Sequence, residues 1–444
     1  MEKRSQGGFG GAIQPGSRNY DRSWIRDGSL TSSALLRMGR TSVVRDFIQW
    51  YAPFQFANGK IPCCASEKGP DPVTENDSHG EFIWLVAEYY RYTGDRAMVE
   101  RMWPHVAAAV EHMDSLRAQR LTPEWQAADK RKFYGLLTPS ISHEGYANPM
   151  HSYWDDFFAY RGYVDAVYLA DVLGRVRDRE RFSASRDAFA YDLTTSVAAA
   201  MKEAKVDYIP GCAELGDFDA TSTTVALTPT GAAELLPEAA VRATFERYWK
   251  FFTDRRDGKI KWDAFTPYEV RTIGSFVRLG WRDRANAALD WFMKYRTPPG
   301  WRQWAEVAYR NPRTPKYVGD MPHTWVGSDF ARSVLDMLVY ERGRDSSLVV
   351  GAGVPWKWLG GRSPVEVRSV QTLYGPLRFS MKAVGDTVET SIDPGTRIPE
   401  GGIIVIPPSR VPFRHATVNG ADAEITSEGG VVVRGLPAKV VLRP

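Results

Sequence analysis

Two neighbouring acids beside aromatic side chains are the strongest candidates for chemistry in this sequence. Asp155 and Asp156 follow Trp154 in the segment YWDDFFAY, at the start of a predicted helix. Aromatic neighbours desolvate a carboxyl group and raise its pKa, while an adjacent carboxyl group can stay ionised. Such a pair can supply a general acid. The structural alternative is a helix N-cap followed by an acid that the helix dipole stabilises.

A third acid, Glu306, lies in a segment rich in tryptophan. Its aromatic and imidazole neighbours along the chain are Trp301, Trp304, Tyr309, His323 and Trp325. An Asp in one aromatic environment opposite a Glu in another forms a pair of carboxyl groups suited to acid and base catalysis. Inversion at a sugar needs space for water, so we expect the carboxyl groups of Asp155 and Glu306 to lie roughly 6.5–9.5 Å apart.

Polar groups beside aromatic rings also mark the segment NYDRSWIRDG. Its members are Asn19, Tyr20, Asp21, Arg22, Trp24, Arg26 and Asp27. Sugar hydroxyls take bidentate partners and sugar rings stack on aromatic faces, so the segment predicts sugar binding. We expect Arg26 and Asp27 to form the floor of the pocket that holds the acids, with Trp154 and Trp304 on its walls. Alternatively, Asp27 only caps the helix that follows.

The segment ENDSHGEF is the next candidate for substrate contact, through Asp77 and His79. Glu75 and His79 could suggest a metal site, but a second His or a third ligand at helical spacing is missing. The alternative is a first helical turn whose acids favour the helix dipole. The sequence also lacks a phosphate-binding glycine loop and a nucleophile elbow, so we expect no metal and no organic cofactor.

Composition excludes several classes of protein. The 57 Lys and Arg residues are scattered among 53 Asp and Glu residues, so neither nucleic acid nor an anionic membrane is an expected partner. Cys63, Cys64 and Cys212 cannot form a disulfide framework or a four-ligand zinc site, and we interpret them as buried thiols. The chain as written has no signal-peptide core, which predicts a cytoplasmic protein, or an exported one if it belongs to a longer precursor.

The positions of these segments follow from a helical pattern that extends to about residue 344. Apolar spacings of three and four predict helices over 27–38, 41–52, 79–93, 96–119, 157–174, 178–205, 218–227, 238–253, 266–279, 282–296 and 325–342. The chemically rich loops lead into every other helix, which is typical of a barrel of helical hairpins. A complete barrel has six inner and six outer helices, but the pattern predicts only five outer ones. We expect the missing outer helix to lie upstream, to be replaced by the first 20 residues, or to come from a partner copy.

From residue 345 the pattern changes to short alternating runs such as VEVRSV, LRFSMKAV, TVETSI and GGIIVIP. Together with glycine, proline and an Asn-Gly turn, these runs predict a small antiparallel β-sandwich. The expected fold is therefore mainly α, an (α/α)6 six-hairpin toroid over 1–344 followed by a β-sandwich over 345–444.

The order of the motifs WIRDG, ENDSHGE, YWDD, GDFDAT and E-V-A-Y-R-N-P-R-T-x-x-Y-V-G-D-x-P-H-T-W resembles the bacterial glucoamylase family, which includes glucodextranases and some trehalases. These are inverting six-hairpin glycoside hydrolases, and the resemblance covers residues from about 19 to 342. It implies that Arg26 and Asp27 bind hydroxyls of the terminal sugar, that Glu306 is the general base, and that the acid after Trp154 is the general acid.

This chain departs from that family at the general acid, because it has Asp155 where the family typically has Glu. Neighbours on a helix diverge by about 100°, so only one of the two acids can face the barrel interior, and we choose Asp155 because it directly follows the tryptophan. The C-terminal runs LYGPLRF and GGIIVIPP look instead like the sandwich that follows α-L-rhamnosidases.

The expected activity is exo-acting, inverting hydrolysis of a terminal sugar, with an α-glucoside-like oligosaccharide as substrate. One alternative is an α-L-rhamnoside or a glycan with uronic acid, whose carboxylate Arg18, Arg22 and Arg26 could bind. Another alternative is a carbohydrate-binding protein without catalysis. The identity of the sugar, its linkage and the oligomeric state do not follow from the sequence.

Overall fold

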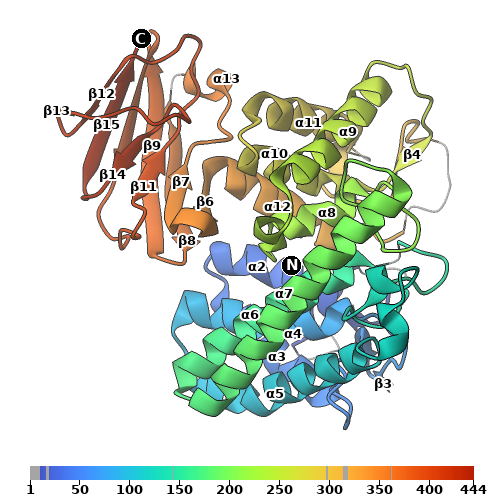
Figure 1. Ribbon diagram of the computed structural model, residues 1–444. Coiled ribbons are helices and arrows are strands. Elements are labelled where there is room, and N and C mark those ends of the chain that lie inside the picture. Colours follow the sequence, from blue (N-terminus) through green and yellow to red (C-terminus); the bar gives the residue numbers. More distant parts are fainter. Residues whose placement is uncertain (1–10, 17–19, 144, 297–298, 314–318, 362) are drawn as a thin grey trace. The chain divides into compact units, whose positions relative to one another are not determined.

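The computed structural model describes residues 11–16, 20–143, 145–296, 299–313, 319–361 and 363–444. The chain forms two compact units (Figure 1). The first comprises described residues within 1–33, 41–269 and 295–328, and the second those within 34–40, 270–294 and 329–444. The division after residue 344 stays a prediction.

Each predicted helix has a counterpart in the structure. These are α2 (Ile25–Arg37), α3 (Thr41–Tyr51), α4 (Asp77–Thr93), α5 (Arg96–Ala118), α6 (Tyr153–Leu173), α7 (Val176–Ala204), α8 (Ala220–Leu227), α9 (Glu238–Arg256), α10 (Thr272–Arg278), α11 (Arg282–Tyr295) and α12 (Thr324–Leu338). A further short helix, α13 (Trp356–Leu359), was not predicted. The mainly helical six-hairpin fold is confirmed.

The last predicted helix ends four residues early. Residues 339–342 form β6 (Val339–Arg342), which pairs antiparallel with β7 (Ser347–Val350). The apolar spacing over 325–342 suits a helix, but a partner strand supplies the hydrogen bonds for the last four residues. The predicted helix over 266–279 also begins differently, with a 3-10 turn over Pro267–Arg271.

Helices α4 and α6 approach each other unusually closely through glycine. A Cβ atom on Gly80 would lie 1.9 Å from the carbonyl oxygen of Phe158, and one on Gly162 would lie 2.8 Å from the Cα of Gly80. Real Cβ contacts are not this short, so both positions require glycine unless the helices move apart. The close crossing joins the two helices whose first turns carry Asp77 and Asp155.

The described part of the first 20 residues forms no helix. Ala12 and Ile13 are buried, and the Ser23 hydroxyl donates to the carbonyl oxygen of Ile13 at 2.5 Å. The backbone N–H of Thr324 donates to the carbonyl oxygen of Pro15 at 2.6 Å. Residues 12–16 therefore bind the segment before α2 and the first residue of α12, and the twelfth helix is not among the described residues before α2.

Two short sheets also connect loops of the first unit. One contains β1 (Ser23–Trp24), β2 (Cys64–Ser66) and β3 (Gly69–Pro70), and the other contains β4 (Ala264–Phe265) and β5 (Ala308–Tyr309). β1 immediately precedes α2, and β5 follows Glu306 by two residues. These pairings fix the loops from which two of the predicted site segments come.

Two sheets of the second unit enclose one apolar core. The six-stranded sheet has the order β13 (Ala421–Asp422), β12 (His415–Val418), β15 (Ala438–Arg443), β10 (Thr387–Ile392), β9 (Gly375–Val384) and β8 (Val365–Thr372). The four-stranded sheet has the order β14 (Val431–Val433), β11 (Ile403–Val405), β7 and β6. Buried residues of both sheets form a single cluster, which confirms the predicted sandwich.

The sandwich is not wholly antiparallel, because β11 runs parallel to β7, with Ile403 opposite Leu348. None of the helices in the described part of the chain is long and apolar enough to cross a bilayer.

Candidate active site

The Asp155 carboxyl group, in the first turn of α6, is held by two hydroxyl groups. Ser140 donates to its Oδ2 and Ser142 donates to its Oδ1, each at 2.6 Å. The residue is 2% exposed. Burial, followed by the charge of Asp77, raises the pKa of Asp155 well above its usual range, although the serine hydrogen bonds act in the opposite direction. A carboxyl group in this environment favours the protonated form that a general acid needs.

The neighbouring carboxyl group has different partners. Asp156 accepts the backbone N–H of Leu137 at 3.2 Å. Burial raises the pKa of Asp156 to about 8, and the Leu137 N–H opposes this shift. The two acids are therefore held by different segments, although both are buried.

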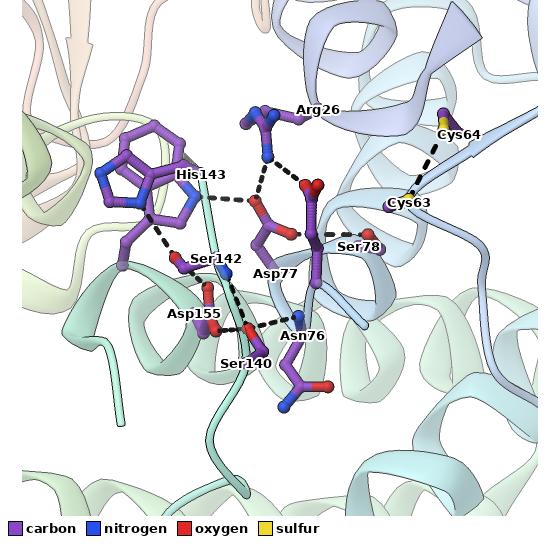
Figure 2. Close-up of polar contacts among 12 residues, drawn as sticks. Arg26, Cys63, Cys64, Asn76, Asp77, Ser78, Ser140, Ser142, His143 and Asp155 are labelled. Atoms are coloured by element: carbon purple, nitrogen blue, oxygen red, sulfur yellow. Dashed lines mark hydrogen bonds and ion pairs between the residues drawn. The ribbon is translucent and has the colours of Figure 1, made fainter. Parts of the chain in front are cut away.

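Three segments that the sequence singled out meet around Asp77 (Figure 2). The Arg26 guanidinium donates to Glu75 Oε2 at 2.5 Å and to Asp77 Oδ2 at 3.2 Å. The indole N–H of Trp154 donates to the same Asp77 oxygen at 2.9 Å. Burial opposes the charge of Arg26, but Glu75 and Asp77 raise its pKa well above the usual value. The starts of α2, α4 and α6 are thus connected by one charged network.

Glu306 is positioned by residues from both ends of the first unit's sequence. The Tyr20 hydroxyl donates to Glu306 Oε1 at 2.8 Å, and the backbone N–H of Asp320 donates to Oε2 at 3.1 Å. Gly319 has a φ of +62°, and a Cβ atom there would lie 2.0 Å from Oε2. Only glycine therefore leaves space for this carboxylate.

His323 lies beside Glu306 without forming an ion pair with it. Its Nε2 atom is 3.9 Å from Glu306 Oε2, and burial lowers the pKa of His323 to about 3. Its backbone N–H donates to the carbonyl oxygen of Trp304 at 2.8 Å, which fixes the loop before Glu306. The imidazole is neutral at ordinary pH, so it does not neutralise the carboxylate.

An aromatic ring from the segment of Asp155 lies close to one from the segment of Glu306. The ring centroids of Trp154 and Trp325 are 6.3 Å apart, and the Arg26 guanidinium lies 5.0 Å from the centroid of Trp325. Tyr268, which the sequence analysis did not single out, lies 4.2 Å from Trp325. Sugar rings bind to such aromatic faces.

The structure adds a group of residues that sequence reasoning missed. The imidazole of His143 stacks on Trp154, with centroids 4.4 Å apart and an interplanar angle of 15°. Its Nδ1 atom is 2.9 Å from Ser142 Oγ, and its Nε2 atom is 2.7 Å from Ser222 Oγ. The signal was a Ser- and His-containing stretch, SISH, upstream of YWDD, but nothing in its spacing indicated a hydrogen-bonded chain.

Other predicted residues lie elsewhere or form fewer contacts with this group. His79 is fully buried, accepts the Ile61 N–H at 3.2 Å, and lies edge-on to His112 of α5 at 4.7 Å. These contacts do not involve Asp155 or Glu306, and a role of His79 in substrate binding stays a prediction. Asp27 is buried at the start of α2, and Trp24 lies edge-on to Tyr20 at 5.1 Å. Arg18 and Asn19 lie outside the described residues.

The charged network also includes an acid that has no role in the expected chemistry. Glu81, one turn after Asp77, is completely buried, and neither carboxyl oxygen has a hydrogen-bond partner among the described residues. Burial raises its pKa well above the usual range. Among the described residues, no three His, Cys, Asp or Glu side chains are placed to hold a metal ion, and the three cysteines are buried and free.

Comparison with known proteins gives this arrangement a context. Residues 21–227 match the family model described as the bacterial alpha-L-rhamnosidase 6 hairpin glycosidase domain. An uncharacterized glycosyl hydrolase of Methanocaldococcus jannaschii is 31% identical over 115 residues, which cover 26% of this chain and 18% of that protein.

Solved structures share the fold at low sequence identity. An alpha-L-rhamnosidase from Dictyoglumus thermophilum has a TM-score of 0.60 and 13% identity, covering 96% of this chain and 46% of the other. The Streptomyces avermitilis alpha-L-rhamnosidase complexed with L-rhamnose has a TM-score of 0.58 and 14% identity, covering 95% of this chain and 38% of the other. A glycosidase variant in complex with glucose has a TM-score of 0.55 and 14% identity, covering 76% of this chain and 93% of the other.

The chain therefore spans less than half the length of these two rhamnosidases and less than a fifth of the curated relative. The rhamnosidase matches agree with the sandwich resemblance seen in the sequence. They favour the rhamnosidase-like alternative over the glucoamylase-like reading that the helical motifs suggested.

Proposed function

We propose that this chain, a six-hairpin glycosidase domain of the bacterial α-L-rhamnosidase type followed by a β domain, is an inverting glycoside hydrolase that removes a terminal neutral sugar. The observation that carries the proposal is the contrast between two buried carboxyl groups. Asp155 lies among hydroxyl groups with a raised pKa, whereas Glu306 accepts hydrogen bonds from Tyr20 and the Asp320 N–H. A buried carboxyl group with a raised pKa, together with a carboxyl group that accepts hydrogen bonds from a hydroxyl and a backbone N–H, can supply the acid and the base of inverting hydrolysis.

In the proposed reaction, Asp155 gives its proton to the glycosidic oxygen as the bond from that oxygen to the anomeric carbon breaks. Glu306 takes a proton from a water molecule, whose oxygen bonds to the anomeric carbon from the opposite face. The anomeric configuration is thereby inverted. The separation of roughly 6.5–9.5 Å between the two carboxyl groups, which leaves space for this water, stays a prediction.

The charges near Asp155 favour a neutral sugar over a uronic acid. Arg26 already pairs with Glu75 and Asp77, and Arg22 pairs with Asp71 at 2.9 Å. Among the described residues, these contacts therefore engage both of the arginines that were expected to bind a sugar carboxylate, Arg22 and Arg26. A negative substrate would also meet the surrounding carboxylates, and like charges repel.

Among neutral sugars, we propose an α-L-rhamnoside or a closely similar glycoside as the substrate. The family match and the two rhamnosidase neighbours support this choice. An α-glucoside is the second candidate, because the glucose-bound glycosidase also shares the fold. The proposed attack is at a chain end, as the sequence resemblance implies.

The test is hydrolysis of aryl α-L-rhamnoside, α-D-glucoside and α-D-glucuronide by the full chain, with the anomer of the released sugar followed by NMR from the start of the reaction. We expect turnover of the rhamnoside with the β-anomer appearing first, and no turnover of the glucuronide. First appearance of the α-anomer would contradict inversion. Sugar binding by calorimetry without any turnover would instead support the carbohydrate-binding alternative, and Glu306→Gln is the inactive control.

A further inference from the structure

A continuous line of hydrogen-bonding groups leads away from Asp155. Ser142 donates to Asp155 Oδ1 at 2.6 Å, and the same Oγ atom is 2.9 Å from Nδ1 of His143. On the other side of the imidazole, Nε2 is 2.7 Å from Ser222 Oγ and 3.7 Å from Asp219 Oδ2. Figure 2 shows Asp155, Ser142 and His143 in sequence. The imidazole stacks on the Trp154 ring.

The two ends of this line differ in solvent exposure, although Ser222, between His143 and Asp219, is also buried. Asp155 and Ser142 are buried, whereas the side chain of His143 is 11% exposed and that of Asp219 is 23% exposed. Each intermediate group, a hydroxyl and an imidazole, can accept one proton while it releases another. The line therefore connects the buried acid with groups that water can reach.

The backbone at Ser142 is held in an unfavourable conformation. Its φ is +54°, which side chains other than glycine seldom adopt. A strained residue persists only where its surroundings hold it, and such strain is frequent at functional sites. Here the strained residue is the one whose hydroxyl contacts both Asp155 and His143.

Asp219 stabilises the far end of the line. It caps α8 by accepting the Ser222 N–H at 3.1 Å, and its carboxylate also accepts the hydroxyl groups of Ser222 and Thr221. Burial would raise the pKa of Asp219, but the neighbouring His143 and the hydrogen bonds from these hydroxyl groups lower it well below its usual range. The group is therefore a carboxylate, and it lies beside the imidazole at the far end of the line.

We propose that Ser142 and His143 relay a proton from solvent beside Asp219 back to Asp155 after each turnover. This inference rests on the proposed function, because it requires Asp155 to lose its proton to the leaving group. His143 and Ser142 are positioning and relay residues that act through Asp155. They do not bind the substrate in this proposal.

The protons balance over one cycle. After Asp155 has protonated the leaving group, the Ser142 hydroxyl proton moves to Asp155 Oδ1, and Ser142 Oγ takes the Nδ1 proton of His143. The imidazole gains a proton at Nε2 from the Ser222 hydroxyl, whose Oγ takes a proton from water beside Asp219, and a half-turn of the imidazole ring then restores the starting tautomer. Glu306 releases to solvent the proton that it took from the attacking water, so the cycle consumes only water and substrate.

Other charged groups near the line do not supply this path. Asp77 from α4 and Asp156 from α6 act on Asp155 through their charges. Asp77 is hydrogen-bonded to Arg26 and Trp154, and Asp156 to the Leu137 N–H. The Ser140 hydroxyl also donates to Asp155, but its other hydrogen bonds are with the backbone N–H groups of residues 76 and 142.

The test compares two leaving groups in the full chain. A dinitrophenyl glycoside departs without a proton, whereas an alkyl glycoside needs one. For His143→Gln, we expect kcat on the alkyl glycoside to fall about tenfold or more, within the range of general acid effects, while KM and turnover of the dinitrophenyl glycoside change little. For His143→Ala, added imidazole should restore part of the loss on the alkyl glycoside.

Two further variants separate the relay from a structural role. Ser142→Gly removes the hydroxyl at a position where glycine tolerates the backbone, and it should show the same dependence on the leaving group. His151→Gln is the matched control, because His151 is bonded to Glu214 at 2.6 Å and belongs to a different group of contacts. Equal losses on both substrates, or no loss on either, would overturn the relay. Full activity of Asp155→Asn would instead overturn the proposed function.

Discussion

At the residue scale, the neighbouring acids Asp155 and Asp156 at the start of α6 are chemically identical but have different hydrogen-bond partners. Hydroxyl groups hold Asp155, whereas a backbone N–H holds Asp156. A hydroxyl can donate to a carboxylate or accept from a carboxylic acid, so Asp155 can lose and regain a proton without losing its contacts. A backbone N–H can only donate, which suits a structural contact.

The loss of kcat on replacing the proposed acid, Asp155, should therefore depend on the leaving group. Asp155→Asn should lower kcat on alkyl glycosides by about 10²–10⁴, the usual contribution of general acid catalysis, with partial recovery on a dinitrophenyl glycoside. Glu306→Gln should show no such recovery. Steady-state kinetics with both substrates and a melting curve for each variant make the measurement, and normal turnover by Asp155→Asn with an inactive Asp156→Asn would exchange the two roles.

The pH dependence of the free energy of unfolding should reflect the titration of the Asp156 carboxyl group. Burial raises its pKa to about 8 in the folded chain, compared with about 3.9 for an exposed Asp. The folded state holds the extra proton between these values, so the free energy of unfolding should fall as pH rises from about 4 to about 8, by at most about 1.4 kcal/mol per pH unit.

Asp156→Asn removes this titration and keeps an oxygen that can accept the Leu137 N–H. The difference in Tm between the variant and the natural chain should therefore shift in favour of the variant from pH 5 to pH 8, as measured by calorimetry. A difference that does not change with pH would show that Asp156 does not titrate in this window.

At the element scale, the site depends on the distance between α4 and α6. These helices carry Asp77 on one side, and Trp154 with Asp155 on the other, and the Trp154 N–H donates to Asp77. The absence of side chains at Gly80 and Gly162 allows the close crossing. The positions of Asp77, Trp154 and Asp155 therefore depend on a contact between the helices that lies one to two turns away from these residues.

Gly80→Ala should force these helices apart, because the new Cβ atom would lie 1.9 Å from the carbonyl oxygen of Phe158. We expect a loss of about 1–3 kcal/mol in stability and a fall in kcat. Gly300→Ala is the matched control, because no atom lies within 4 Å of the added Cβ there. Denaturant unfolding and kinetics measure both effects, and equal behaviour of the two variants would contradict the role of the close crossing.

At the scale of the whole molecule, the β-sandwich shares its core with the end of the last long helix. Val339 belongs to the buried cluster, and Leu335 and Leu338 pack against it. The four-stranded sheet also begins with β6, which lies before the predicted boundary at residue 344. The apolar end of α12 and the edge of β6 therefore need the residues that follow them.

A chain that ends at residue 344 should aggregate or lose cooperative unfolding, because removal of β7 leaves β6 unpaired and exposes the apolar residues at 335, 338 and 339. Size-exclusion chromatography and thermal melting, with the full chain as control, test this expectation. A monomeric, cooperatively melting and active 1–344 fragment would instead support the predicted boundary as a limit of independent folding.

The sequence by itself determined the elements and the loops that carry chemistry. Helical periodicity and alternating strand patterns are local properties, and they correctly predicted the helices and the sandwich. Acids beside tryptophan are also a local property, and the roles assigned to them stay predictions. The six-hairpin resemblance was also confirmed by the family match and by the rhamnosidase structure that shares the fold.

Only the tertiary structure decided which residues contact one another. The strand at 339–342 depends on β7, the burial of His79 depends on α5, and the difference between Asp155 and Asp156 depends on the loop that carries Ser140 and Ser142. The line through His143 joins that loop to the start of α8, almost eighty residues further along the chain. Such contacts are set by the packing of distant segments, which local spacing in a sequence does not encode.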